Sequence, residues 1–169
     1  MKDIEQKTKI KAIILAAGVG SRIKPLTDNC PKCLLKVGRE TILNRMITNI
    51  QKNGIHEVVF VLGYLEEKIK NYVKTQFPDL IIHFVRNARY AETNTGFSLM
   101  LAMDLIQDSA FVKFDADVVF DKKILKNLIE SKYENCLCID KNFNLDAEEI
   151  KVIIGDDNKV IKASKKVDP

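Results

Sequence analysis

Two glycines, an arginine and a lysine form the first group of residues that could bind a ligand. Gly18 and Gly20 follow an apolar run, and Arg22 and Lys32 come soon after them. Glycines at the end of a strand let backbone N–H groups converge on an anion. The rigid arginine fork and the mobile lysine can then hold different phosphates of a triphosphate. The alternative is a tight turn beside two solvated side chains.

The glycine segment differs from the two common phosphate-binding loops. A Walker A loop has four residues between its glycines and then Gly-Lys-Ser/Thr, and residues 18–22 lack both features. A dinucleotide-binding loop has a third glycine that opens a helix, whereas Ile23 stands here and Pro25 follows. The sequence therefore predicts an extended phosphate-binding loop of another kind.

Two carboxylates, Asp115 and Asp117, follow a later apolar run. Carboxylates beside bound phosphates are ligands that Mg²⁺ uses, with substrate oxygens and water completing its octahedron. The alternative is that both residues cap the turn into the next helix, a role for which Asp121 is better placed. Strand alternation puts Lys113 on the same face as Asp115, where it either pairs with that carboxylate or extends to solvent; we interpret it as structural.

The elements that must position these groups follow an alternating pattern. Apolar runs typical of buried strands alternate with segments of helical periodicity from residue 10 to residue 131. Such alternation predicts a parallel sheet with helices on both faces and ligands at the carboxyl ends of the strands. The expected strands are 10–17, 58–62, 80–85 and 110–114, and the expected helices are 41–53, 65–77, 96–106 and 122–131.

The pattern changes after residue 132. Three strands are expected at 136–140, 151–154 and 159–163 with no helix between them, and the turn residues 155–158 predict a hairpin that joins the last two. We therefore predict an α/β protein with a Rossmann-like, GT-A-like, mostly parallel sheet and an antiparallel extension near the C-terminus. Its 169 residues fit a single domain, 1–169.

The cysteines and histidines suggest no further chemistry. Cys30 and Cys33 are separated by Pro and Lys and do not open a helix, which disfavours a redox site. A zinc site would need all four cysteines, from two distant segments, to meet in the fold. We expect free, buried thiols, and neither histidine is a credible base or ligand. These residues are Cys30, Cys33, Cys136, Cys138, His56 and His83.

Composition excludes several classes of protein. Hydrophobic residues make up 46% of the chain and charged residues 30%, which excludes a disordered chain, and no apolar run is long enough to cross a bilayer. The net charge of +4 is spread along the chain, without the basic block typical of nucleic-acid binding. The first residues lack the pattern of a secretory signal, so we expect a cytoplasmic protein with no membrane partner. The oligomeric state is left open.

Residues 15–27 and 31–35 together resemble the signature of nucleotidyltransferases, which join a nucleoside triphosphate to a phosphorylated acceptor and release pyrophosphate. Within that family, residues 93–99 and 114–121 most resemble the bacterial choline-phosphate cytidylyltransferases and their relatives that act on inositol phosphate or 2-aminoethylphosphonate. Nucleotidyltransferases that act on sugar 1-phosphates usually have a different sequence at the positions of residues 93–99. The resemblance implies Mg²⁺ as cofactor, CTP as the donor and a small phosphorylated acceptor such as phosphocholine.

The resemblance also implies roles for individual residues. Arg22 would stabilise the leaving pyrophosphate and Lys32 the charge on the α-phosphate, while Asp117 would be the principal metal ligand and Asp115 the secondary one. Lys165 would hold the acceptor phosphate, the alternative being a solvated lysine at a strand end. The nucleotide-binding residues would be Leu15, Ala16, Ala17, Gly18, Gly20, Ser21, Asn94, Gly96 and Ser98.

Other interpretations stay open at this point. Asn94 or Thr95 is also a candidate N-cap for the helix that follows, and both roles are compatible. A sugar-1-phosphate uridylyl- or thymidylyltransferase is the alternative within the same class. Family members usually continue beyond the position of Pro169 with segments that cover the acceptor, so the resemblance also allows a truncated nucleotide-binding module without full activity.

Overall fold

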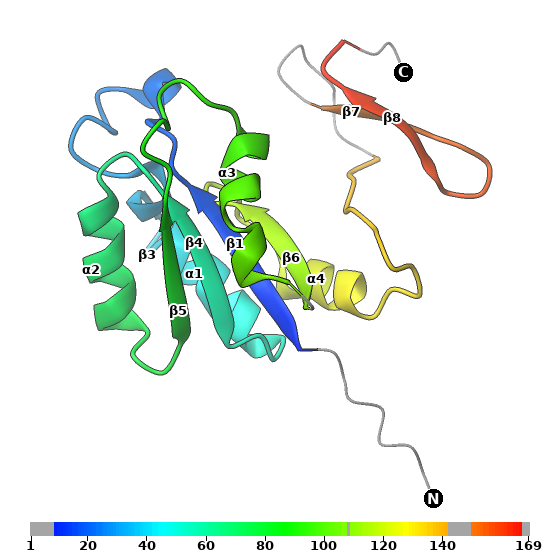
Figure 1. Cartoon of the computed structure of the whole chain (residues 1–169), viewed down its shortest axis with the longest axis horizontal. Coiled ribbons are helices and arrows are strands. Elements are labelled where there is room, and N and C mark those ends of the chain that lie inside the picture. Colours follow the sequence, from blue (N-terminus) through cyan, green and yellow to red (C-terminus); the bar gives the residue numbers. More distant parts are fainter. Residues whose placement is uncertain (1–8, 108, 142–149, 167–169) are drawn as a thin grey trace, which may run out of the picture. The chain divides into compact units, whose positions relative to one another are not determined.

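The computed structural model describes residues 9–107, 109–141 and 150–166. The chain divides into two compact units, Met1–Lys126 and Asn127–Pro169, which are described separately below. Figure 1 shows the central sheet of the first unit and the strand pair of the second.

The first unit is built on a four-stranded sheet in the order β5-β4-β1-β6. Every neighbouring pair in this sheet is parallel, as the alternating pattern predicts. In register, Leu15 lies opposite Val61 on one side and Asp115 on the other. The carboxyl ends of these strands therefore meet at one edge. The strands are β1 (Ile10–Ala16), β4 (Glu57–Leu62), β5 (Ile81–Arg86) and β6 (Ala110–Asp115).

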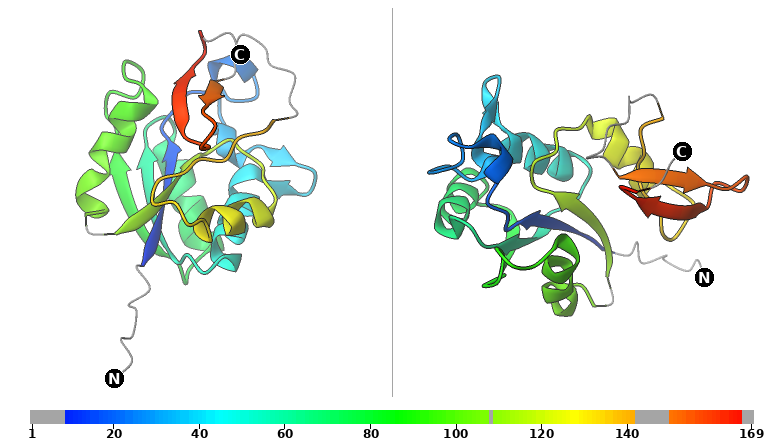
Figure 2. Two further views of the ribbon diagram at one scale, coloured as in Figure 1. Left: turned by 90° about the vertical axis from the view of Figure 1, so that its right-hand side faces the viewer. Right: turned by 90° about the horizontal axis from the view of Figure 1, so that it is seen from above.

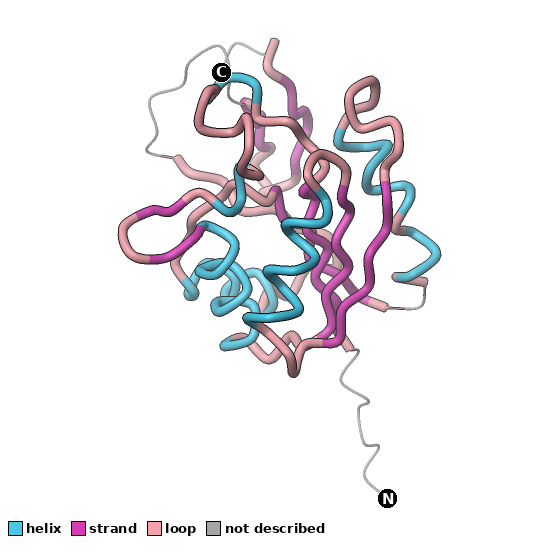
Figure 3. The backbone as a smooth tube through the Cα atoms, turned by 90° about the vertical axis from the view of Figure 1, so that its left-hand side faces the viewer, coloured by secondary structure: helices cyan, strands magenta, loops and turns pink. Residues whose placement is uncertain are grey.

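Helices cover both faces of this sheet, which confirms the predicted layers (Figure 3). The helices α1 and α2 lie on one face and α3 on the other (Figure 2). Thr41 caps α1 by accepting a hydrogen bond from the backbone N–H of Asn44 at 3.0 Å. The helices are α1 (Ile42–Lys52), α2 (Glu66–Gln76), α3 (Thr95–Leu101) and α4 (Lys122–Ile129).

Alternate residues of the strands form the core on the two sides of the sheet. One cluster joins Ile13 and Leu15 of β1 and Val59 of β4 to Ala102 and Ile106, which follow α3. On the opposite face the strands present side chains such as Ile14 and Phe60 toward α1, whose apolar stripe is buried. Burial on both faces explains why the central strands are almost entirely apolar.

Two segments of the first unit differ in detail from the prediction. The helix expected over 96–106 ends at Leu101 and continues as a 3₁₀ turn over Met103–Leu105, a tightening that lets Ala102 and Ile106 pack into the core. The long loop between β1 and α1 contains two 3₁₀ turns, Ser21–Ile23 and Lys32–Leu34, and a short antiparallel pair. That pair consists of β2 (Lys36–Val37) and β3 (Glu40–Thr41).

The second unit contains the predicted hairpin. Strands β7 (Lys151–Ile154) and β8 (Val160–Ser164) pair antiparallel, and the backbone N–H of Gly155 donates to the carbonyl of Lys159 at 2.9 Å across the turn. The strand expected over 136–140 is absent from this described segment, so that prediction is wrong. Leu137 is 49% exposed, and a strand needs a partner that supplies hydrogen bonds to its backbone.

Among the described residues, no helix has both the length and the apolar character needed to span a membrane.

Candidate active site

A polar pocket of about 480 Å³ lies where β1 and β6 end, within the first unit. It brings the glycine segment and the two carboxylates, far apart in sequence, to one cavity. That juxtaposition is the geometry on which the sequence-based hypothesis depended. The predicted site residues that line the pocket are Leu15, Ala16, Ala17, Gly18, Gly20, Arg22, Lys32, Asn94, Ser98, Asp115 and Asp117.

Gly20 gives the glycine loop, residues 17–22, its shape. Its φ of +70° lies in the left-handed region, which favours glycine. The buried hydroxyl of Thr27 donates to the Gly20 carbonyl at 2.9 Å, and a Cβ on Gly20 would lie 3.0 Å from Cγ2 of Thr27. Ser21 starts the following 3₁₀ turn and is not among the residues that line the cavity, and its role in nucleotide binding stays a prediction. Thr27 therefore holds the loop in its turn.

Lys32 connects the loop to the carboxylates. It begins a 3₁₀ turn after Pro31, and its ammonium group forms an ion pair and hydrogen bond with the carboxylate of Asp117. The two side chains are 34% and 35% exposed, so water and ligands reach this pair. A lysine and a carboxylate at one cavity wall can bind a phosphate and a cation side by side.

The second carboxylate, Asp115, ends β6. Lys113 donates to it at 2.7 Å, which is the first of the two alternatives that strand alternation left open. The backbone N–H of Ala116 donates to the carbonyl of Leu15 at 3.2 Å and ties the end of β6 to β1. We refer to Asp115 and Asp117 as the acid pair. Within the part of the chain that the structure describes, no group of three or more His, Cys, Asp or Glu side chains is placed to hold a metal.

A second wall of the pocket follows β5 and enters α3. Asn94 is the N-cap of α3, and its side chain accepts a hydrogen bond from the N–H of Phe97 at 3.0 Å. Asn94 also lines the cavity together with Ser98, so capping and pocket formation coexist at this residue, whereas Gly96 lies in the first turn of α3 and outside the lining. Asp121 likewise caps α4, since it accepts from the N–H of Lys123 at 2.8 Å.

The sequence analysis missed Tyr90, which lines the same wall. Tyr90 packs directly over Gly63, where an added Cβ would lie 2.6 Å from Cβ of Tyr90, and its ring lies 6.4 Å from that of Tyr64. The hydroxyl of Tyr64 contacts the carbonyls of Thr27 and Asp28 at 3.0 and 2.8 Å. Through Tyr64, Tyr90 is thus connected to the loop that follows β1. A glycine directly after an apolar strand is a local signal in the sequence, but its aromatic partner lies far along the chain.

The four cysteines differ in exposure, and Cys30 is only partly buried. Cys33 is buried at the pocket wall, and burial raises the pKa of its thiol to about 12, which makes it a poor nucleophile. Cys136 and Cys138 are exposed, so the expectation of buried thiols is wrong for them; the segment that carries them has no strand partner in the described part of the second unit. All four thiols are free, as expected.

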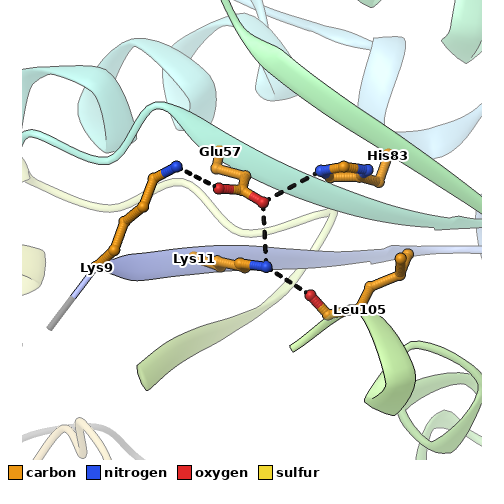
Figure 4. A network of polar contacts seen from close by, with 5 residues as sticks. All are labelled: Lys9, Lys11, Glu57, His83 and Leu105. Atoms are coloured by element: carbon orange, nitrogen blue, oxygen red, sulfur yellow. Dashed lines mark hydrogen bonds and ion pairs between the residues drawn. The ribbon is translucent and has the colours of Figure 1, made fainter. Parts of the chain in front are cut away.

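A second polar cluster lies near the amino ends of the strands (Figure 4), and none of its residues lines the pocket. Lys9 and Lys11 contact the carboxylate of Glu57 at 2.7 and 3.1 Å, and His83 lies 3.2 Å from it. Lys11 also donates to the carbonyl of Leu105 at 2.7 Å. The hydrogen bonds from Lys9, which contributes most, and from Lys11 lower the pKa of the Glu57 carboxyl to about 2. His83 is therefore part of a structural network.

Lys165 follows β8 in the second unit, so its predicted contact with the acceptor stays a prediction.

Comparison with known proteins identifies relatives over most of the chain. Residues 11–160 match the family model described as nucleotidyl transferase. The chain is 34% identical over 139 residues to the CTP:phosphoglutamine cytidylyltransferase of Campylobacter jejuni, a match that covers 79% of this chain and 54% of that protein. It is 32% identical over 157 residues to the choline-phosphate cytidylyltransferase of Streptococcus pneumoniae, which covers 89% and 62% respectively.

A solved structure shows the same likeness. The CTP:phosphocholine cytidylyltransferase from Streptococcus pneumoniae has a TM-score of 0.67 and 28% identity, and the match covers 92% of this chain and 64% of that one. The chain thus spans between 54% and 64% of the length of these relatives. The likeness confirms the predicted Rossmann-like fold with its antiparallel strand pair.

Proposed function

Because this chain belongs to the nucleotidyl transferase family, we propose that it transfers a cytidylyl group from CTP to a small phosphorylated acceptor such as phosphocholine and releases pyrophosphate. The observation that carries the proposal is the single pocket in which the glycine loop, Arg22 and Lys32 face the acid pair. Relatives described as cytidylyltransferases support CTP as donor.

The reaction needs little covalent chemistry from the protein. An oxygen of the acceptor phosphate attacks the α-phosphorus of CTP, a new P–O bond forms, and the bond to pyrophosphate breaks with its electrons. Arg22 at the glycine loop stabilises the charge on the departing pyrophosphate. Lys32 neutralises charge on the α-phosphate and exchanges its contact with Asp117 for one with the nucleotide. Catalysis then rests on positioning and electrostatic stabilisation.

The acid pair fits a Mg²⁺ ion. Both carboxylates are at least one-third exposed at the cavity, and Mg²⁺ is commonly bound through one or two carboxylates plus phosphate oxygens and water. Asp117 would be the principal ligand and Asp115 the secondary one. When bound, the ion would offset negative charge on the phosphates.

Three further parts of the proposal extend beyond the pocket. Residues 1–169 act as one nucleotidyltransferase domain, Lys165 holds the phosphate of the acceptor, and the protein works in the cytoplasm on small molecules. The support for a single domain is the match to the family over residues 11–160, which extends into both compact units, whereas Lys165 lies beyond it.

Pyrophosphate release tests the function directly. The full chain is incubated with Mg²⁺, CTP and phosphocholine, and pyrophosphate is measured with a coupled assay. We expect release that needs both substrates and falls at least about a hundredfold in Arg22→Ala. CTP binding without release would support the nucleotide-binding module instead. Release with UTP or dTTP and a sugar 1-phosphate, but not with CTP, would support the sugar-phosphate alternative.

A further inference from the structure

Asp117 lies in the middle of a loop that joins β6 to α4, and we call residues 116–120 the acid loop. The sheet fixes the start of this loop, because the backbone N–H of Ala116 donates to the carbonyl of Leu15. The middle of the loop buries little, since Val118 and Val119 are both exposed. The place of Asp117 in the pocket therefore depends on how the two ends of the loop are held.

Two contacts of Phe120 hold the carboxyl end of the acid loop. Its ring stacks on that of Phe114 in β6, with the ring centroids 5.6 Å apart and the ring planes 17° from parallel. Its backbone carbonyl accepts a hydrogen bond from Nδ2 of Asn49 at 2.8 Å. Because a carbonyl oxygen can only accept, this bond fixes which end of the Asn49 amide faces the loop. Asn49 thus connects α1 to the acid loop.

A second asparagine of α1 makes a similar bond beyond the loop. Asn53, at the C-cap of α1, donates from Nδ2 to the carbonyl of Lys122 at 3.2 Å and to that of Asn49 at 2.8 Å. Lys122 is the first residue of α4 and follows its cap, Asp121. Asn53 therefore joins α1 to α4, whereas Asn49 bonds to the acid loop itself.

The ion pair of Lys32 with Asp117 also holds the acid loop, but only while the pocket is free. In the proposed mechanism Lys32 leaves Asp117 for the α-phosphate, and the loop then keeps only the anchors at its two ends. Mg²⁺ needs near-ideal octahedral geometry, so a carboxylate that holds it must stay in place. The anchor at Phe120 is then needed most when nucleotide and metal are bound.

We propose that Asn49 is a positioning residue: through the carbonyl of Phe120 it holds the acid loop where Asp117 can bind the metal that accompanies the nucleotide. The inference rests on the proposed function, since it assumes that Asp117 binds that metal. Asn49 is not among the residues that line the pocket, so its effect passes through the backbone of the loop. It should therefore strengthen CTP binding only when Mg²⁺ is present.

The gain in CTP affinity that Mg²⁺ provides measures the position of Asp117. Dissociation constants for CTP are determined by titration calorimetry with the full chain, once with Mg²⁺ and once with EDTA. We expect Mg²⁺ to tighten CTP binding to the wild-type protein. Asn49→Ala should weaken binding roughly tenfold with Mg²⁺ and leave it unchanged in EDTA. An equal loss in both conditions, or no loss, would overturn the positioning role.

Asn53→Ala is the matched control. It removes the same kind of amide donor from the end of the same helix, but the carbonyl that it loses lies in α4 and not in the acid loop. Alanine favours helix formation, so Asn49→Ala should keep α1 intact. We expect Asn53→Ala to keep the gain from Mg²⁺. A gain that falls equally in both variants would overturn the assignment to the bond between Asn49 and Phe120.

A double-mutant cycle tests whether Asn49 acts through Asp117. Asp117→Ala should itself remove most of the gain from Mg²⁺. If Asn49 works by placing Asp117, the variant Asn49→Ala/Asp117→Ala should bind CTP with Mg²⁺ as tightly as Asp117→Ala does. A further loss of affinity in the double variant would overturn the route through Asp117.

The wild-type measurement separates failure of this inference from failure of the proposed function. CTP binding that Mg²⁺ does not strengthen would overturn the inference and leave nucleotide binding standing. Absence of CTP binding in both conditions would overturn both.

Discussion

Lysine–carboxylate pairs stand at both edges of the central sheet, but their surroundings differ. At the carboxyl edge, Lys32 and Asp117 are each about one-third exposed. At the amino edge, the side chain of Glu57 is 10% exposed and that of Lys11 17%. Exposed pairs contribute little to stability, whereas breaking a buried pair leaves an uncompensated charge. The first kind can exchange partners for a ligand, and the second holds the strands together.

This difference in exposure predicts different results for similar substitutions at the two edges. Loss of a charge at the carboxyl edge should affect chemistry far more than folding. Loss of a charge at the amino edge should do the reverse.

The largest expected effect is on turnover in Asp117→Ala. Removing one of the two carboxylates at the cavity should lower the rate at least a hundredfold, about 3 kcal/mol of transition-state stabilisation. The free energy of unfolding should change by less than about 1 kcal/mol, because the pair with Lys32 is exposed. Pyrophosphate release and urea unfolding measure the two quantities, and undiminished turnover would refute the role of Asp117.

Glu57→Gln should show the opposite pattern. It leaves the largely buried Lys11 beside a neutral amide, so the free energy of unfolding should fall by about 3 kcal/mol. Turnover of the protein that remains folded should be unchanged, since the Glu57 cluster (Lys9, Lys11, Glu57 and His83) does not line the pocket. Urea unfolding gives the stability, and a selective loss of turnover would contradict the separation of the two edges.

A pH series sharpens the same contrast. The pKa of Glu57 is lowered from 4.5 to about 2, so its charged form stabilises the fold fully above pH 4.5, and that contribution is lost as pH falls toward 2. The stability difference between wild-type protein and Glu57→Gln should therefore shrink across this interval. Other carboxylates titrate similarly in both proteins and cancel in this comparison. A stability difference that stays constant over this interval would show that the pKa of Glu57 is not lowered.

Gly63→Ala should have the smallest effect. Its Cβ would lie 2.6 Å from Cβ of Tyr90, so the pocket wall must shift, and CTP affinity should fall roughly tenfold. Gly54→Ala, before β4 at the amino edge, is the control: its φ of +78° predicts a loss of stability of about 1 kcal/mol with unchanged affinity. Equal CTP affinities of Gly63→Ala and Gly54→Ala would show that Tyr90 does not take part in nucleotide binding.

The sheet and the two halves of the site were predictable because their signals are local. Apolar strands alternate with helices, and the glycine loop and acid pair each follow a strand, so parallel order alone brings them to one edge. Tyr90 and Asn49 escaped prediction because their importance comes from contacts with Gly63 and Phe120 that only the fold creates.

The errors have a related cause. The segment 136–140 has the residue types of a strand, but strand formation depends on a partner that local sequence does not specify. Glu57 and Lys11 are single charged residues at strand ends, and nothing in their spacing indicates that the sheet register brings them together.

The central claim is that the glycine loop and the acid pair hold one metal-bound triphosphate. Mn²⁺ in place of Mg²⁺ broadens the NMR signals of nearby amides, so spectra of the isotope-labelled chain with Mn²⁺ and CTP locate the ion. The account predicts that broadening is strongest at Gly18, Gly20 and Asp117, is weakest around Glu57, and is lost in Asp117→Ala. Broadening centred on the Glu57 cluster, or unchanged in Asp117→Ala, would contradict it.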